Sequence, residues 1–246
     1  SFTNLPLVRV IIPSTIKLIE SSAFHNCTSL KEVKFENDFE MDSFECSLNN
    51  NAFSQCTSLT EITIPEYVTS IGDYCFHNCS NLSQIIFNTT SIESIGCSTF
   101  EGCSQLKQII IPQSVTKIGK CAFKGCSSLT QITVPSHVST IEENAFIECP
   151  SLKQISLPSS VTSFGPNIFD KISYLIISGD IKYIPDKFFE GCSILRSISL
   201  PESVISIGNN AFNKCSLLKE IKIPSNVQSI GNNAFNYCSS LNQAII

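Results

Sequence analysis

Cysteine is the residue with the clearest capacity for chemistry in this chain of 246 residues, which contains 13 of them. Thiols can form disulfides, hold zinc or act as nucleophiles. Nine of the thirteen recur at one spacing, each three residues after a phenylalanine: Cys27, Cys56, Cys79, Cys103, Cys126, Cys149, Cys192, Cys215 and Cys238. A thiol at such a repeated position behaves as a small buried hydrophobic group. Thiols that point the same way from successive turns also have poor geometry for bridging.

The other four cysteines are Cys46, Cys75, Cys97 and Cys121. The last three lie near the same turn of successive units, so one bridge among them remains open, and an odd total leaves at least one thiol free unless a partner chain contributes. The pair Cys75 and Cys79, with His77 between them, resembles a zinc motif only superficially. Structural zinc needs four converging ligands, so we expect no metal site.

The remaining chemistry-bearing residues do not form a recognisable catalytic pattern. The three histidines, His25, His77 and His137, have no Ser-His-Asp or Cys-His context, and the chain has no H-E-x-x-H, phosphate-binding glycine loop or dinucleotide fingerprint. We therefore expect no enzyme activity and no cofactor. A net charge of −5 argues against nucleic acid as a partner, and no apolar run reaches the ~20 residues of a membrane span.

Phenylalanine and leucine show what positions the cysteines. The phenylalanines recur at a nearly constant interval: Phe24, Phe53, Phe76, Phe100, Phe123, Phe146, Phe169, Phe189, Phe212 and Phe235. A leucine follows each of them by six residues: Leu30, Leu59, Leu82, Leu106, Leu129, Leu152, Leu175, Leu195, Leu218 and Leu241. Such a period predicts a repeat architecture in which each unit buries its apolar side against the next.

The unit, L-x-x-I-x-I-P-x-x-V-x-x-I-G-x-x-A-F-x-x-C-x-x, also predicts local structure. Its first isoleucines alternate with polar residues, which indicates a strand, and proline ends that strand. A second short extended piece and a glycine turn follow, and the A-F-x-x-C segment has apolar spacing typical of a short helical turn. We therefore expect a β-rich α/β solenoid: a right-handed, curved leucine-rich-repeat stack with parallel sheets and short helical turns.

The run Ile111-Pro112-Gln113-Ser114-Val115-Thr116-Lys117-Ile118-Gly119, continuing to Ala122-Phe123 and Cys126, resembles the BspA-like (Treponema-type) leucine-rich repeats, and the resemblance covers essentially the whole chain. It implies a protein-binding domain of a cell-surface or secreted protein, with a role in cell adhesion or host interaction and with an extracellular-matrix or cell-surface protein as partner. The alternative is an intracellular, cytoplasmic scaffold, because many unpaired cysteines suit a reducing compartment.

The repeat predicts one domain over residues 1–246, made of about ten 23-residue units and irregular at 36–47 and 170–181. It begins and ends without a capping motif, so we expect part of a longer array, or self-association through uncapped ends. The insert from Glu36 to Cys46 alternates acidic residues with Phe39 and Phe44. It fits either a site for a basic partner or a tolerated surface loop.

The predicted binding surface is the outward side of the first strand in each unit, on the broad concave face that solenoids present. It comprises Gln84, Ile86, Lys107, Gln108, Ile110, Thr130, Gln131, Thr133, Lys153 and Gln154. Apolar Ile86 and Ile110 between amides and lysines suggest a protein contact. The alternative is a glutamine ladder with isoleucines that serve only strand propensity.

Overall fold

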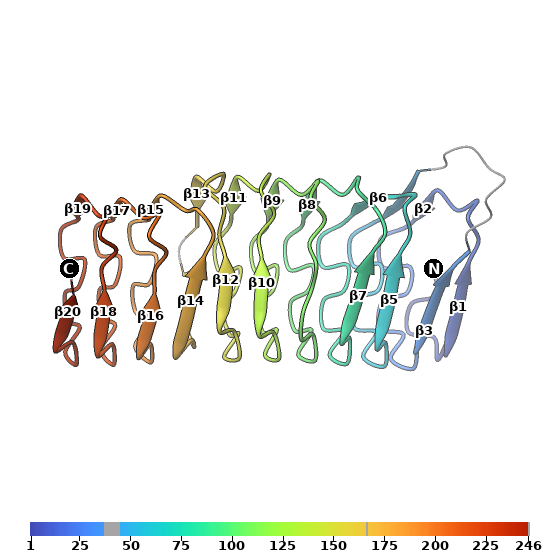
Figure 1. The fold of residues 1–246 in the computed structure, drawn as a ribbon. Helices are drawn as coiled ribbons and strands as arrows, with labels where there is room; N and C mark the ends of the chain where they lie inside the picture. Colours follow the sequence, from blue (N-terminus) through green and yellow to red (C-terminus); the bar gives the residue numbers. More distant parts are fainter. Residues whose placement is uncertain (37–44, 166, 246) are drawn as a thin grey trace.

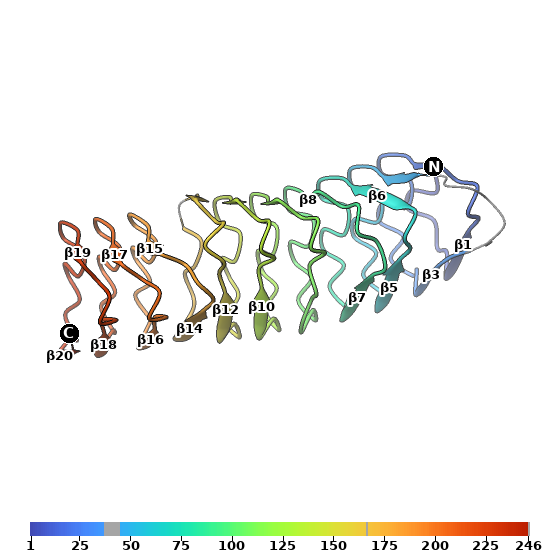
Figure 2. The same ribbon diagram turned by 45° about the horizontal axis from the view of Figure 1, so that its top comes forward.

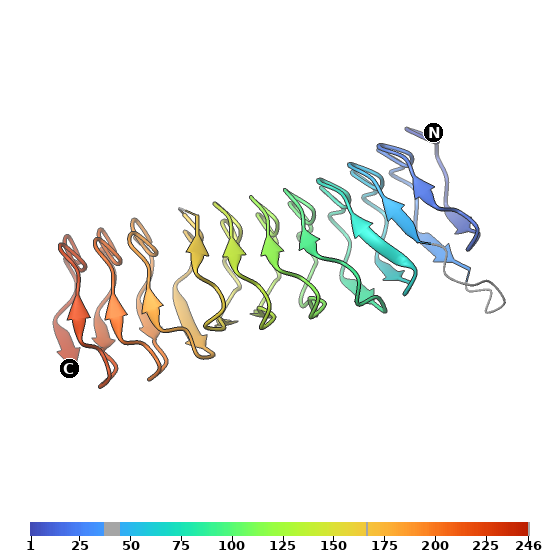
Figure 3. The same cartoon turned by 90° about the horizontal axis from the view of Figure 1, so that it is seen from above.

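The computed structural model describes residues 1–36, 45–165 and 167–245, and these residues form one elongated stack of turns (Figure 1). The two ends of the chain lie at opposite ends of the stack. The stack bends only gently, both in the view turned by 45° (Figure 2) and in the view from above (Figure 3). The two rows of strands therefore follow a weakly curved course along the molecule.

The described residues contribute two rows of ten short strands, and the turn that contains residues 107–111 has no first-row strand. The first row consists of β1 (Arg9–Ile12), β3 (Glu32–Phe35), β5 (Glu61–Ile64), β7 (Gln84–Phe87), β10 (Gln131–Thr133), β12 (Gln154–Ser156), β14 (Tyr174–Ser178), β16 (Ser197–Ser199), β18 (Glu220–Lys222) and β20 (Gln243–Ile245). The second row consists of β2 (Leu18–Ile19), β4 (Cys46–Leu48), β6 (Val68–Ile71), β8 (Ser94–Ile95), β9 (Lys117–Ile118), β11 (Thr140–Ile141), β13 (Ser163–Phe164), β15 (Tyr183–Ile184), β17 (Ser206–Ile207) and β19 (Ser229–Ile230).

Most neighbouring strands within a row pair in parallel, and the period of the repeat sets the register. Ile132 lies level with Ile155 in the first row, and Ile118 lies level with Ile141 in the second. Equivalent side chains therefore stack along the length of the molecule, as the repeat predicts. The solenoid with parallel sheets is confirmed.

The expected helical turns, and with them the α/β class, are wrong, because no helix occurs in the described residues. Around Phe123, the flanking residues Cys121 (φ 55°) and Gly125 (φ 71°) adopt left-handed conformations, and a right-handed helix cannot pass through them. The segment is a pair of tight turns. Some of its amide groups bond within the unit and others bond to the next unit. The N–H of Cys126 donates to the carbonyl of Phe123 in the same unit (3.1 Å), whereas the N–H of Phe123 donates to the carbonyl of Ala145 in the next unit (2.9 Å).

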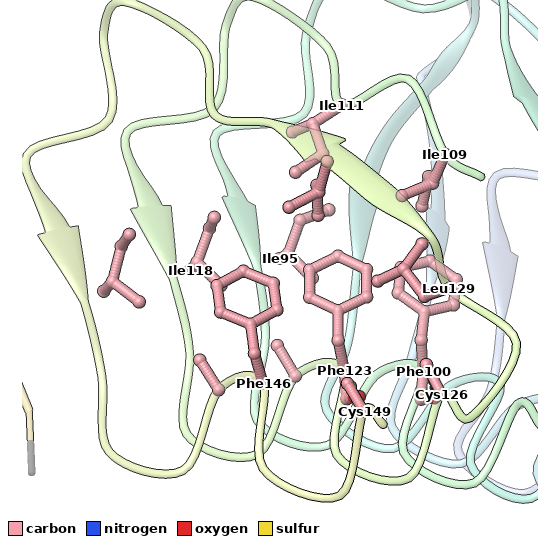
Figure 4. Close-up of a cluster of buried hydrophobic side chains, with 14 of the residues drawn as sticks. Ile95, Phe100, Ile109, Ile111, Ile118, Phe123, Cys126, Leu129, Phe146 and Cys149 are labelled. Atoms are coloured by element: carbon pink, nitrogen blue, oxygen red, sulfur yellow. Dashed lines mark hydrogen bonds between the residues drawn. The ribbon is translucent and has the colours of Figure 1, made fainter. Parts of the chain in front are cut away.

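The core lies between the two rows of strands and the turns. It consists of ladders, which are lines of equivalent buried side chains, one from each unit, stacked along the molecule. The repeat phenylalanines stack nearly parallel, with ring centroids 5.5 Å apart from Phe100 to Phe123 and again from Phe123 to Phe146 (Figure 4). Leu129 is fully buried beside them. Each ring thus contacts the unit before and the unit after, so packing in one unit depends on both neighbours.

One residue of the predicted leucine ladder is misplaced. Leu175 lies level with Ile198, the fourth position of the next unit, and not with Leu195. The unit that follows Phe169 has lost three residues before β14, so buried Ile172 stands one full repeat before Leu195 instead. On the other side of β14, Ile177 lies level with Ile155, so the register slips by two residues there.

Extra aromatic side chains fill the stack at this deletion. The second-row strands β13 and β15 are not paired. Phe188 occupies the position that alanine holds in most units, and it contacts Phe164 edge-on at 4.9 Å and Phe169 at 5.6 Å. All three rings are buried or half-buried. Packing of these aromatic side chains therefore joins the two units where the shortened turn leaves β13 and β15 unpaired.

A one-residue insertion produces a second irregularity. The step along the chain from Ile71 to Ile95 is one residue longer than the step from Ile95 to Ile118. At this insertion β6 and β8 are unpaired, and residues 107–111 form no strand, being joined to the next unit by a single bridge between Ile110 and Thr133. Changes of repeat length thus account for some of the breaks in the strand rows: β3 and β5, at the long insertion, are also unpaired, but so are β16 and β18, between which the repeat is regular.

Truncating one member of a ladder should cost substantial stability. We expect Leu129→Ala to lower the free energy of unfolding by about 2–5 kcal/mol, because it opens a cavity between two units that cannot close independently. Urea unfolding followed by circular dichroism measures the change. The exposed neighbour Thr130→Ala is the matched control, and a similar loss in both variants would contradict the ladder as the source of stability.

Candidate functional site

All ten residues of the predicted binding surface are exposed on the outward side of the first row, the surface called here the first-row face. Pairing brings several of them side by side: Gln131 lies level with Gln154, and Ile110 with Thr133. Gln84 and Ile86 lie on β7, across the break from residues 107–111, where no strand pairing is found in the described residues. The ten residues therefore share one exposed face, which is divided at the insertion, and binding of a partner there stays a prediction.

The most exposed large apolar side chain on this face lies at that break. Ile110 is 85% exposed and Ile86 is 43% exposed. Gln108, Gln131 and Thr133 line a shallow hollow together with Ile110. Because residues 107–111 lack a complete strand, the side chain of Ile110 stands clear of the surface with little cover from its neighbours.

A second apolar pair, which the sequence analysis missed, lies on β14. Tyr174 is 56% exposed and Ile176 is 51% exposed. Ile176 lies level with Gln154 on one side and with Ser199 on the other, so it continues the first-row face. Assigning Leu175 to the leucine position obscured this pair. Counting back one full repeat from Leu195, which leads to Ile172, would have revealed it.

The charges on the central part of the face are all positive. Between Ser83 and Ser199, the outward strand positions carry Lys107, Lys153 and Arg196 and no acidic residue. Among the described residues, none of these three side chains forms an ion pair. This part of the surface is therefore cationic, although the whole chain carries a net charge of −5.

Some cations elsewhere on the molecule form ion pairs with carboxylates. In the second row Lys117 contacts Glu142 at 2.7 Å. Near the ends of the first-row face, Arg9 contacts Glu32 at 3.0 Å and Lys222 contacts Glu202 at 3.0 Å. The central first-row face thus differs from the two ends of that face in carrying no acidic residue at its outward strand positions.

The repeated cysteines have a structural role that goes beyond their size. All thirteen cysteines are free thiols. Each of the nine repeated thiols donates a hydrogen bond to the phenylalanine carbonyl of the preceding unit, as Cys126 does to Phe100 at 3.2 Å. Figure 4 shows Cys126 and Cys149 below the stacked rings. The thiols therefore link units and face no solvent-filled site.

Burial also removes the reactivity of the fully buried thiols in this set. It raises the pKa of Cys149 and of Cys192 to about 12, because the thiolate loses its hydration. It likewise raises the pKa of Cys56 to about 12, with a further contribution from the nearby Cys27. At neutral pH these side chains are protonated, and a protonated thiol is neither a nucleophile nor a metal ligand.

The remaining candidates do not converge on a reactive site. Cys75 is buried at an alanine position, and the sulfur of half-buried Cys97 lies 3.7 Å from the hydroxyl of Tyr74. His77 lies 3.7 Å from Glu101, and its pKa is lowered chiefly by burial. Over residues 1–36, 45–165 and 167–245, no group of three or more potential metal ligands is found.

Most of the acidic insert, residues 37–44 with Asp38, Phe39, Glu40, Asp42 and Phe44, lies outside the described residues. At its start, the carbonyl of Glu36 accepts a hydrogen bond of 2.9 Å from the hydroxyl of Tyr67. The insert as a site for a basic partner therefore stays a prediction.

The fold and this surface define a class: a parallel β-solenoid with leucine-rich units and a broad exposed face. A family model for the BspA type leucine rich repeat region matches in six copies over residues 1–49, 46–176 and 170–246. The chain therefore belongs to the BspA type leucine-rich repeat family, a generally non-catalytic protein-interaction fold, as the sequence resemblance predicts.

The chain is also similar to several solved structures. The chain is 30% identical to a leucine rich cell surface protein from Faecalibacterium prausnitzii, over 99% of this chain and 80% of that one, with a TM-score of 0.49. It is 25% identical to a leucine-rich repeat protein from Bacteroides ovatus (97% and 78% covered, TM-score 0.56). It shares the fold of a T. pallidum leucine rich repeat protein at 22% identity (97% and 86% covered, TM-score 0.55). No curated protein matches the chain.

A search of the described residues for a helix with the length and apolarity to cross a membrane found none.

The buried thiols predict a loss of stability at alkaline pH. Unfolded thiols ionise near a pKa of about 8.5, whereas folded Cys149 keeps its proton up to a pKa of about 12. The unfolded state therefore binds fewer protons across this window, and stability falls as the pH rises through it. Each such thiol contributes a slope of about 1.4 kcal/mol per pH unit.

Urea midpoints measured from pH 7 to pH 11 check this expectation. The variant Cys149→Ala removes one buried thiol but keeps the tyrosines and lysines that ionise in the same range. Its free energy of unfolding should fall less steeply with pH than that of the wild type. The slopes should differ by about 1.4 kcal/mol per pH unit, which corresponds to one proton. Parallel pH dependences in the two proteins would show that this thiol does not stay protonated in the folded state.

Proposed function

We propose that this chain is a non-enzymatic protein-binding domain and that its partner binds the central first-row face. One observation carries the proposal: this face combines exposed apolar side chains, Ile110, Tyr174 and Ile176, with cations that have no carboxylate partner. Apolar anchors inside a polar rim are typical of protein interfaces, and aromatic residues and arginine are enriched there.

The geometry of the face supports a protein partner. The rows of strands fix the outward side chains at regular intervals on a rigid support, so little conformational entropy is lost when they are covered. Gln131 and Gln154 lie between the two apolar patches and can both donate and accept hydrogen bonds. A surface of this kind can hold a polypeptide without rearrangement of the solenoid.

A place at the cell surface or outside the cell, in adhesion or host interaction, is the finer part of the proposal. Family membership supports it, as does the 30% identity to a protein described as a leucine rich cell surface protein. An extracellular-matrix or cell-surface protein would then be the partner. The thirteen free thiols favour the alternative, an intracellular scaffold, because disulfides are rare in reducing compartments. Antibody labelling of intact and permeabilised cells would separate the two.

Self-association through the ends of the stack also remains a proposal. The first turn has an apolar hollow lined by Phe2, Leu7, Ile11 and Leu18, and Phe2 and Leu18 are 50% and 43% exposed. Further units of a longer array would cover such a surface equally well.

Three substitutions test the role of the first-row face. We expect Ile110→Ser combined with Tyr174→Ser and Ile176→Ser to reduce capture of partner proteins from cell-surface extracts by about tenfold or more, because anchor residues dominate binding energy. Quantitative pull-down with the purified chain as bait measures the loss.

A control with similarly exposed side chains away from this face accompanies the triple variant. Ile205 is 43% exposed in the loop before β17, and Tyr237 is 70% exposed on the turn side. The double variant Ile205→Ser with Tyr237→Ser should capture the same proteins as the wild type. Equal capture by the triple variant and the wild type, with both folded by circular dichroism, would contradict the proposal.

A further inference from the structure

We infer that the first-row face recognises an extended, acidic segment of a protein that carries two apolar side chains four residues apart. This inference rests on the proposed function and specifies the chemistry of the partner. It follows from the placement of three cations, two apolar patches and a row of amides on the central face.

The cations form a row at a constant position of the repeat. Lys107, Lys153 and Arg196 each directly follow the leucine of their unit, and they occur in every second unit. At about 4.8 Å per strand, two units separate Lys107 from Lys153 by roughly 10 Å, and the two-residue slip at β14 places Arg196 roughly 12 Å from Lys153. An acidic chain lying along the stack would therefore meet a positive charge about every three residues at ~3.3 Å per residue.

The apolar patches have a spacing that suits the same extended chain. Ile110 lies level with Thr133 and Thr133 with Ser156, whereas Ile176 lies level with Gln154, two residues before Ser156 on β12. Three strand steps of about 4.8 Å and two residues of about 3.3 Å along the strand therefore separate the two isoleucines, roughly 16 Å in all. Four residues of an extended chain that crosses the face obliquely cover ~13 Å, and the two side chains span the remaining ~3 Å. Residues at i and i+4 of a strand point to the same side, so both can face the solenoid.

Electrostatics select the sign of the partner. The three central cations have no carboxylate partner in the described residues, so burying them under a neutral or basic segment would leave their charges uncompensated. Acidic side chains supply the missing partners. They would also find no acidic residue at the outward strand positions of this region to repel them.

A sulfated polysaccharide is the other anionic ligand that such a row could attract. It would leave Ile110, Tyr174 and Ile176 without apolar contacts, and these side chains are between 51% and 85% exposed. The observations therefore favour a polypeptide that brings both carboxylates and apolar side chains.

A phage-displayed library of random dodecapeptides tests directly which amino acids the first-row face selects in a bound peptide. Selection on the wild-type chain should enrich peptides rich in Asp and Glu, with aliphatic or aromatic residues at i and i+4. The enriched peptides, made synthetically, should bind the triple variant Lys107→Glu, Lys153→Glu and Arg196→Glu about tenfold more weakly or worse. Raising the salt from ~50 to ~300 mM should also weaken their binding to the wild type.

The matched control reverses Lys31 and Lys219, which hold the same position of the repeat but directly precede Glu32 and Glu220. The variant Lys31→Glu with Lys219→Glu should bind the enriched peptides as the wild type does. Enrichment of basic or neutral peptides, no enrichment, or equal binding to both charge variants would overturn the inference. Heparin binding that the triple variant loses, without any enriched peptide, would also overturn it and indicate a polysaccharide ligand.

The outcomes also separate this inference from the proposed function. If Ile110→Ser with Tyr174→Ser and Ile176→Ser abolishes capture of partner proteins while the library yields no acidic peptides, the face binds protein but the inferred partner chemistry is wrong. If neither capture nor peptide binding depends on the first-row face, both proposals fail.

Discussion

Each unit of this protein depends on the next to complete its hydrogen bonds and its packing. The main chain of Phe100 shows this dependence. Its carbonyl accepts the amide of Cys103 in its own turn (3.1 Å) and the thiol of Cys126 in the next (3.2 Å), while its own N–H donates to Ala122 (2.9 Å). Its ring stacks between the rings of two neighbours. Because so many contacts join units and few lie within one, an isolated unit would expose most of its apolar surface and backbone donors, and the stack is stable only as a whole.

This dependence also explains how the molecule accommodates change. A unit one residue longer or three residues shorter cannot keep both strand rows in register, so pairing is lost where β6 meets β8 and where β13 meets β15. Aromatic packing around Phe188 maintains contact at the deletion. The same two irregularities expose apolar side chains on the first-row face, at Ile110 and at Ile176. Departures from the repeat thus create the features that distinguish this face from a uniform sheet.

Much of the fold could be predicted from the sequence, because buried positions such as Leu129 and Phe123 repeat at a period that only stacking explains. The turn segment could not, since apolar residues at helical spacing fit successive tight turns equally well. The signal against a helix lay at residues such as Asn78 and Gly102, which tolerate the left-handed conformation that interrupts it. The ten predicted surface residues are exposed as expected, whereas Tyr174 was missed because Leu175, six residues after Phe169, was assigned to the leucine position that the deletion moves to Ile172. The partner itself could not be predicted, because outward side chains are not constrained by the core.

The central claim is that stability and shape follow from whole units in register, and deleting one unit tests it most directly. Removing residues 130–152 joins Leu129 to Lys153 and preserves the period of the neighbouring units. We predict a folded protein with one cooperative urea transition, whose m-value is lower by about a tenth. Removing only residues 130–140 shifts every later unit out of register and should leave a chain without a cooperative transition. If the two deletions behaved alike, either both folded or both unfolded, the account would be contradicted.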